Sequence, residues 1–221
     1  MSDDPKAYVF DAYGTLFDVH SAVRRHAAAL GPEAERVSEL WRTKQLEYSW
    51  VRALMGRYRD FWSLTEDALD YALEAVPSAN ADARDDLLDA YRTLDCYAEV
   101  PDVLRALRER GAKTAILSNG SPGMLASATE SAGIGALLDD TFSVDGLATF
   151  KVDPAVYQLV TDAYGLEPHE VAFQSSNRWD IAGASAFGFR CTWVNRSGAP
   201  DEYPHLRPER VVRDLSELID G

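Results

Sequence analysis

The chain has 221 residues, of which 46% are hydrophobic and 26% charged, the proportions of an ordinary globular protein. Its 22 Lys and Arg residues against 36 Asp and Glu residues give a formal net charge of −14, which argues against nucleic acid or an anionic membrane surface as a partner. No apolar stretch is long enough to span a bilayer, and the acidic start Met1-Ser2-Asp3-Asp4 lacks signal-peptide character, so we expect a cytoplasmic protein. The two cysteines, Cys96 and Cys191, are too few and too far apart to predict a disulfide framework or a zinc site.

A short apolar run near the start of the chain ends on a carboxylate. Tyr8, Val9 and Phe10 are strand formers, and Asp11 follows them directly. Gly14 then breaks the run, which places Asp11 where a buried strand gives way to a loop. Ligands bind at this edge of open α/β sheets, and a carboxylate there can act as a nucleophile. The same residue could simply cap the loop, and spacing alone leaves both interpretations open.

From Val19 to Asp95 the pattern is helical and carries no strong strand signal. Arg42 and Leu46 lie one turn apart on one side of the clearest helix, which we expect over residues 39–58. An arginine above an apolar ladder usually extends to water, so periodicity alone favours a solvent-exposed Arg42. The spacing predicts that the apolar face of this helix consists of Trp50, Val51, Leu54, Met55 and Tyr58.

After Cys96 the pattern changes to alternating strands and helices. Ser121-Pro122 predicts the start of one helix, with serine as its N-cap and proline at its first position. The alternation predicts an α/β fold with a doubly wound parallel sheet. We place this core at residues 1–18 and 96–221 and an inserted helical cap domain at residues 19–95. The expected strands are 8–10, 113–117, 141–144, 171–174 and 192–194, and the expected helices of the core include 101–110, 154–164 and 181–187.

Polar side chains follow the predicted strands. They are Asp11 to Thr15, Ser118-Asn119, Lys151 and Ser175 to Asp180. In a doubly wound sheet these loops converge on one edge. Each also has an ordinary structural explanation: Ser118-Asn119 as turn formers, Lys151 as a surface lysine, and Asp180 as the N-cap of the helix that follows it. Their concentration at the strand ends favours a functional site.

Several separated motifs agree in order and spacing with one known family. The chain resembles the haloacid dehalogenase superfamily, in its L-2-haloacid dehalogenase branch, and the resemblance runs nearly from end to end. It implies a Rossmann-like core with an inserted helical cap, a hydrolase that acts on carbon–halide bonds, and a homodimer. The motifs that carry it are Asp11-Ala-Tyr-Gly-Thr15, Trp41-Arg42, Asp60-Phe61-Trp62, Ser118-Asn119-Gly120, Lys151, Ser175-Ser-Asn-x-Trp-Asp180 and Val194-Asn195-Arg196.

The resemblance implies hydrolysis of L-2-haloalkanoic acids to D-2-hydroxy acids and halide, with neither cofactor nor metal. In this mechanism Asp11 displaces the halide from C2 and forms an aspartyl ester, which water then hydrolyses. The residues it assigns to catalysis are Asp11, Thr15, Arg42, Lys151, Ser175, Asn177 and Asp180. The residues it assigns to substrate binding are Tyr13, Leu46, Phe61, Ser118, Asn119, Tyr157 and Trp179.

The implied roles fit the chemistry of the side chains. Arg42, Asn119 and Trp179 hold the departing halide, because a guanidinium and a ring edge both offer positive potential. Lys151 keeps the nucleophile ionised, since an opposite charge nearby favours the charged form. Asp180 is the expected base or orienter for the water, and Ser118 is expected to bind the substrate carboxylate.

The other members of the set support these groups. Thr15, Ser175 and Asn177 are expected to fix the nucleophile and the water. An apolar wall is expected to exclude competing water from the first step, and it consists of Tyr13, Leu46, Phe61 and Trp179. Tyr157 is a further family position, for which core packing is the ordinary explanation.

Two alternatives remain open. Phosphatases of the same superfamily carry a second Asp where this chain has Tyr13, and further acids that hold Mg²⁺ where it has Ser175-Ser176-Asn177. Asp11 and Asp180 alone make a poor Mg²⁺ site, so a Mg²⁺-dependent phosphohydrolase ranks second. A non-catalytic relative ranks third, since the charged residues of the motifs are all present.

Overall fold

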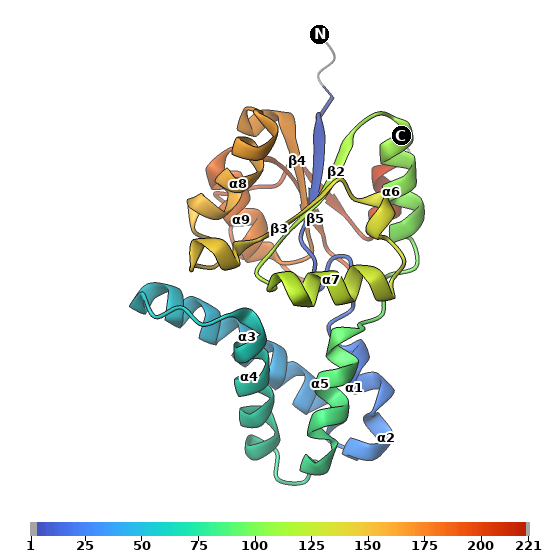
Figure 1. Cartoon of the computed structure of the whole chain (residues 1–221), viewed down its shortest axis with the longest axis vertical. Helices are drawn as coiled ribbons and strands as arrows, with labels where there is room; N and C mark the ends of the chain where they lie inside the picture. Colours follow the sequence, from blue (N-terminus) through green and yellow to red (C-terminus); the bar gives the residue numbers. More distant parts are fainter. Residues whose placement is uncertain (1–3, 220–221) are drawn as a thin grey trace.

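The computed structural model describes residues 4–219, so the two ends of the predicted core domain, 1–3 and 220–221, lie outside the described part (Figure 1). Six strands form one parallel sheet in the order β3-β2-β1-β4-β5-β6, which confirms the predicted doubly wound core. The strands are β1 (Ala7–Phe10), β2 (Lys113–Ser118), β3 (Asp140–Ser143), β4 (Val171–Ser175), β5 (Arg190–Val194) and β6 (Arg210–Val212).

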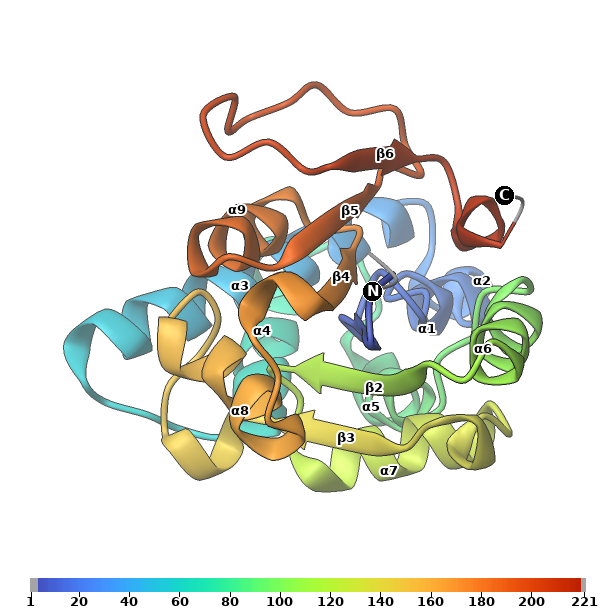
Figure 2. The ribbon, with the colours of Figure 1, turned by 90° about the horizontal axis from the view of Figure 1, so that it is seen from above.

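The central strands are short apolar runs that are covered on both faces. All five residues of β4 are buried, as are the last five of β2. Figure 1 shows α8 and α9 on one side of the sheet and α6 on the other, and Figure 2 shows the strands from above. The helices of the core are α6 (Val100–Glu109), α7 (Pro122–Ser131), α8 (Pro154–Tyr164) and α9 (Arg178–Phe187). Within residues 4–219, no helix combines the length and the apolar character that a membrane crossing requires.

The chain between β1 and α6 is helical and lies below the carboxyl ends of the strands (Figure 1). An isolated bridge between Phe17 and Cys96 joins the two segments that lead into and out of this region. Its α-helices are α1 (Ser21–Arg25), α2 (Ala27–Leu30), α3 (Ala34–Met55), α4 (Phe61–Ala75) and α5 (Arg84–Arg92). They all fall within the predicted cap, whose boundaries at residues 19 and 95 stay a prediction.

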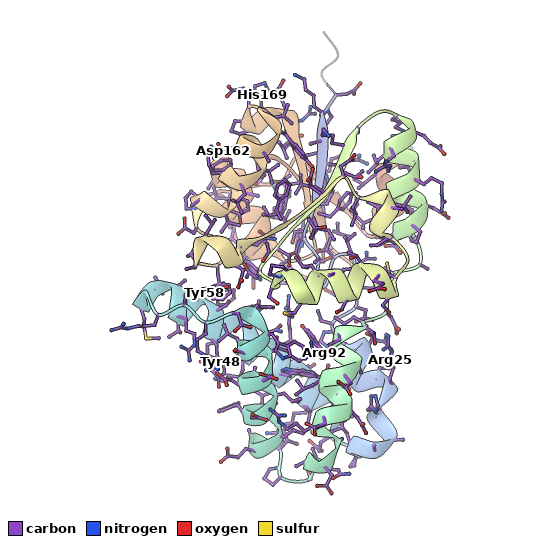
Figure 3. All side chains as sticks on the ribbon, in the orientation of Figure 1. Arg25, Tyr48, Tyr58, Arg92, Asp162 and His169 are labelled. Carbon is purple, nitrogen blue, oxygen red and sulfur yellow. The ribbon has the colours of Figure 1, made fainter. Side chains whose placement is uncertain are left out.

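Tyr58 links this helical region to the core. It lies in the segment between α3 and α4, at the junction seen in Figure 3. Its hydroxyl donates a hydrogen bond to Asp145 of the core, and its ring packs 5.0 Å from that of Phe150. Because Phe150 precedes Lys151, this contact supports the loop that carries the lysine.

Helix α3 differs from its prediction in both extent and orientation. It ends at Met55, where Gly56 adopts a left-handed conformation (φ 62°), so Tyr58 is not helical. The predicted apolar face is wrong for most of its length, because Val51, Leu54 and Met55 are 45%, 88% and 57% exposed. The buried side includes Val37, Trp41, Gln45 and Ser49, which follow one another at four-residue spacing. Two of these residues are polar, which is why apolar periodicity points to another side.

Two smaller predictions about the core need correction. Ser121 occupies the N-cap position of α7 as predicted, but its side chain forms no capping hydrogen bond. The strand β6 was missed, because it has three residues and two of them, Arg210 and Val211, are exposed at the edge of the sheet.

Candidate active site

The site lies where the direction of the chain across the sheet reverses. β1 and β4 are neighbours, and the chain continues from β1 toward β2 and from β4 toward β5, on opposite sides. This is the switch point at which doubly wound sheets bind ligands. Asp11 follows β1, and its backbone N–H donates to the carbonyl of Gln174 in β4 at 2.9 Å. The loops that begin at Asp11 and Ser175 therefore meet at one point.

Asp11 is held by four donors in an asymmetric way. Its Oδ2 accepts hydrogen bonds from Thr15 Oγ1 (3.1 Å), Asn177 Nδ2 (2.8 Å) and, at longer range, Ser175 Oγ (3.4 Å). Its Oδ1 accepts one from Lys151 Nζ at 3.0 Å. The residue is 5% exposed. The predicted supporting residues Thr15, Ser175 and Asn177 thus all contact the same carboxylate oxygen.

Lys151 bridges two carboxylates inside the protein. Its side chain is fully buried, so the alternative of a surface lysine is wrong. Nζ lies 3.0 Å from Asp11 Oδ1 and 2.7 Å from Asp180 Oδ2. Asn119 fixes the backbone here, since its Oδ1 accepts the N–H of Lys151 at 2.9 Å. Burial alone would lower the pKa of Lys151, but the charges and hydrogen bonds of the two carboxylates raise it above its usual value.

Asp180 is buried in the first turn of α9. That helix begins at Arg178, so the alternative that Asp180 is its N-cap is wrong. Burial raises the pKa of Asp180 to about 6, against the opposing effect of Lys151. Tyr157 Oη donates to Asp180 Oδ1 at 2.8 Å, and burial and this carboxylate raise the pKa of Tyr157 well above its usual range. Tyr157 therefore packs in the core and also holds a member of the site.

Asn177 connects the nucleophile loop to the helical region. It occupies the N-cap of α9, yet its side chain forms no capping hydrogen bond. Its amide nitrogen instead donates to Asp11 and to the carbonyl of Tyr13 (3.2 Å), and its Oδ1 accepts from Arg42 Nη2 at 3.4 Å. Arg42 Nη2 also donates to the Tyr13 carbonyl at 3.1 Å. The prediction of a water-exposed arginine is therefore wrong, because the guanidinium of Arg42 is half-buried beside the nucleophile loop.

Aromatic rings form a wall beside these polar groups. The buried ring of Tyr13 lies 6.2 Å from that of Phe61, as the predicted pocket requires. Trp179 is half-buried and meets the ring of Trp50 edge-on at 5.4 Å. Sequence reasoning missed Tyr91, which stacks on Tyr13 at 5.8 Å, and Phe150, which lies 6.0 Å from Phe61. The position of Phe150 directly before Lys151 was a usable signal, whereas no motif marked Tyr91.

Ser118 and Leu46 are among the predicted residues that form no hydrogen bond with Asp11 in the described chain. Ser118 ends β2, is 1% exposed and accepts the N–H of Gly120 at 3.1 Å through its hydroxyl oxygen. Leu46 is half-buried on α3, one turn beyond Arg42. A cavity of about 940 Å³ adjoins the site and is lined in part by Trp50, Phe150, Lys151 and Trp179. The contacts of Ser118 and Leu46 with substrate stay predictions.

The two carboxylates of the site share one ammonium. The ammonium of Lys151 lies between the carboxylates of Asp11 and Asp180, at hydrogen-bond distance from each. Within the described range 4–219, no three side chains of His, Cys, Asp or Glu are grouped so that they could hold a metal ion. The donor set around Asp11 is thus an ammonium, two hydroxyls and an amide.

Comparisons with known proteins show what the chain is similar to. A family model described as haloacid dehalogenase-like hydrolase matches residues 5–188. The (S)-2-haloacid dehalogenase 1 of Pseudomonas sp. (strain CBS-3) is 48% identical over 217 residues, which cover 98% of this chain and 96% of that protein. The (S)-2-haloacid dehalogenase 4A of Burkholderia cepacia is 46% identical over 99% of this chain and 95% of its own length. A solved structure of the L-2-haloacid dehalogenase from Xanthobacter autotrophicus, with chloropropionic acid covalently bound, is 39% identical with a TM-score of 0.87 and covers 97% of both chains.

Proposed function

Because the chain belongs to the haloacid dehalogenase-like hydrolases, in their L-2-haloacid dehalogenase branch, we propose that it hydrolyses L-2-haloalkanoic acids to D-2-hydroxy acids and halide. The observation that carries this proposal is the buried carboxylate of Asp11, with three donors on one oxygen and Lys151 on the other. A carboxylate fixed in this way is suited to nucleophilic attack at carbon. The cap boundaries and cytoplasmic location predicted from the sequence, and the homodimer that the resemblance implies, remain predictions.

The hydrogen bonds of Asp11 favour Oδ1 as the attacking oxygen. Oδ2 accepts from Thr15, Ser175 and Asn177, which leaves it little free lone-pair density. Oδ1 accepts only from Lys151 in the described chain and retains a lone pair. In the first step a bond forms between Oδ1 and C2 as the carbon–halogen bond breaks. Attack from the side opposite the halogen inverts the L configuration.

The same donors suit the second step. Once Oδ1 is esterified, Oδ2 becomes the carbonyl oxygen, and its three donors already point at the position where negative charge develops. Water adds to Cγ and gives a proton to Asp180, whose pKa of about 6 leaves it mostly ionised at neutral pH. The Cγ–Oδ1 bond then breaks, and the departing alkoxide takes up the proton.

Arg42 is the proposed halide-binding group. Its guanidinium donates to backbone and side-chain oxygens at 2.8–3.4 Å and, among residues 4–219, to no carboxylate, so its charge stays available for an anion. Asn119 and Trp179 complete the proposed halide site, and Ser118 is proposed to bind the substrate carboxylate. The rings of Tyr13 and Phe61 exclude water while the halide leaves.

A single turnover in H₂¹⁸O tests the covalent step. With enzyme in excess, the hydroxy acid from the first turnover must carry an unlabelled oxygen, because that oxygen comes from Asp11. The label must then appear in the peptide around Asp11. The covalently bound chloropropionic acid in the Xanthobacter autotrophicus structure supports such an intermediate. Labelled product with an unlabelled peptide would show that water attacks C2 directly.

Two further measurements separate this function from the phosphohydrolase alternative. Halide release from L-2-chloropropionate, with D-lactate as the product, is expected to continue after exhaustive treatment with EDTA, because the ammonium of Lys151 supplies the charge between Asp11 and Asp180. Phosphate release from phosphate monoesters that requires added Mg²⁺, without halide release, would favour the alternative.

A further inference from the structure

We propose that Gln45 is a positioning residue for the halide-binding guanidinium of Arg42, and that Thr65, beside Tyr91, fixes the orientation of its amide. This inference rests on the proposed function. None of these three residues lies in a motif that the family resemblance singled out. Gln45 and Thr65 are 1% and 0% exposed, on the facing helices α3 and α4, and Tyr91 is 4% exposed on α5.

The hydrogen bonds leave one orientation for the amide of Gln45. Thr65 Oγ1 donates its single proton to the carbonyl of Phe61 at 2.7 Å, so toward Gln45 it can only accept. Nε2 of Gln45 therefore points at Thr65 Oγ1, at 2.7 Å. Oε1 then faces Arg42 and accepts from Nη1 at 2.8 Å, where only an acceptor fits because a guanidinium only donates. Tyr91 Oη lies 3.0 Å from Nε2 and 3.2 Å from Oε1 and completes the network.

This network holds Arg42 from the helical side. The other contacts of the guanidinium, to Tyr13 and Asn177, use Nη2 and come from the core, whereas Gln45 takes Nη1. Tyr91 also stacks on the ring of Tyr13, with the ring centroids 5.8 Å apart and an interplanar angle of 12°, so the network also contacts the nucleophile loop through Tyr13. The guanidinium plane is thereby fixed by contacts from both sides.

The chemistry of the amide matters as much as its place. An amide oxygen fixes a guanidinium without cancelling its charge, whereas a carboxylate at the same position would form an ion pair and compete with a halide. Burial of an unpaired amide is costly, so a glutamine whose atoms all have partners can be kept at this position. The buried position of Gln45 on α3 is explained on this basis.

The sharpest test changes Thr65, which does not touch Arg42. Thr65→Val keeps the shape of the side chain but removes the acceptor for Nε2, so the amide loses one of the two contacts that hold its orientation and Oε1 is held less firmly against Arg42. We expect halide release from L-2-chloropropionate in a single turnover to slow by about 10-fold, because the charge-assisted hydrogen bond from Arg42 to Oε1 is weakened and not removed. Thr65→Ser restores the hydroxyl and is expected to recover most of the rate. Chloride and bromide are expected to inhibit Thr65→Val less strongly than the parent protein.

Two variants of Gln45 test the nature of the acceptor. Gln45→Met removes it, and Gln45→Glu keeps its shape but adds a negative charge. Both are expected to slow halide release and to weaken halide inhibition, while hydrolysis of the ester, followed separately by rapid quench, changes by less than about threefold. Ser49→Ala is the matched control, because Ser49 is buried one turn further along α3 and its hydroxyl bonds only to the carbonyl of Leu46 within the described chain. It is expected to keep the parent rates.

The outcomes separate this inference from the proposed function. If the parent protein releases no halide from any L-2-haloacid, the proposed function fails. If the parent is active and folded Thr65→Val and Gln45→Met keep halide release within about threefold, the inference fails and the function stands. Equal slowing of both chemical steps, or the same loss in Ser49→Ala, would show a general effect on folding and would also overturn the inference. Thr65→Val decides the matter if Gln45→Met does not fold.

Discussion

Replacing Lys151 by methionine would leave two carboxylates facing each other inside the protein. The side chain of Lys151 is fully buried, and those of Asp11 and Asp180 are 7% and 0% exposed, so solvent cannot replace the lost charge. Removal of one partner from a buried ion pair costs about 3–5 kcal/mol. We expect Lys151→Met to lower the free energy of unfolding by about this amount at pH 8, and to abolish halide release.

The loss of stability in Lys151→Met should be smaller at low pH than at high pH. The pKa of Asp180 is already raised to about 6 with Lys151 present, and it rises further without the lysine. Folded Lys151→Met then binds a proton at a pH where unfolded Asp180 stays ionised, so its stability is greatest in acid and is lost as pH rises through the raised pKa. The slope is about 1.4 kcal/mol per pH unit for one proton. The deficit against the parent should therefore be about 1–3 kcal/mol smaller at pH 5.5 than at pH 8.

Urea unfolding at these two pH values measures both quantities. Lys151→Met combined with Asp180→Asn is the matched control, because it removes one of the two stranded carboxylates and should recover most of the stability at pH 8 without restoring activity. A deficit below about 1 kcal/mol at pH 8, or the same deficit at both pH values, would refute the idea that Lys151 stabilises the site by its charge.

Three further predictions follow from individual contacts. Because burial raises the pKa of Asp180 to about 6, the rate of ester hydrolysis should rise as pH increases through about 6, and a flat profile between pH 5 and 7 would exclude Asp180 as the base. Arg42→Ala should lower kcat by about 10²-fold with little loss of stability. Thr43 is the exposed neighbour of Arg42, and Thr43→Ala should change neither kcat nor stability. Equal use of both 2-chloropropionate enantiomers by the parent protein would contradict the predicted pocket. Gln174 is buried in β4, and neither of its amide atoms is hydrogen-bonded in the described chain, so Gln174→Met should raise the free energy of unfolding by about 1–3 kcal/mol. A lower free energy of unfolding, measured with urea, would show that the amide is bonded in the folded protein.

The sheet could be predicted from sequence because its strands are short apolar runs covered on both faces. In parallel sheets the carboxyl ends share an edge, so the order of motifs along the chain was enough to predict that Asp11, Ser175 and Asn177 would meet. Strand β6 gave no such signal, since most of its residues are exposed at the sheet edge.

Burial of the charged residues could not be predicted in the same way. Asp11 and Lys151 are 140 positions apart, and their contact depends on how two loops converge in space. Local sequence treats Lys151 as a surface residue and Asp180 as a helix cap, because both are the common roles of these residue types at such positions. The concentration of polar residues at the strand ends and the family resemblance, which matches several motifs at once, favoured a functional site instead.

Helix α3 shows where pattern reasoning fails for a functional reason. Amphipathic periodicity assumes that the buried side is apolar, yet the buried side of α3 carries Gln45 and Ser49 while Leu54 is exposed. A guanidinium that is to hold an anion needs a partner that fixes it without neutralising it, and a buried amide supplies such a partner. The presence of Gln45 on the buried side thus follows from the task proposed for Arg42. A polar residue on the buried side of α3 therefore indicates a functional role for Gln45, which lies in none of the sequence motifs.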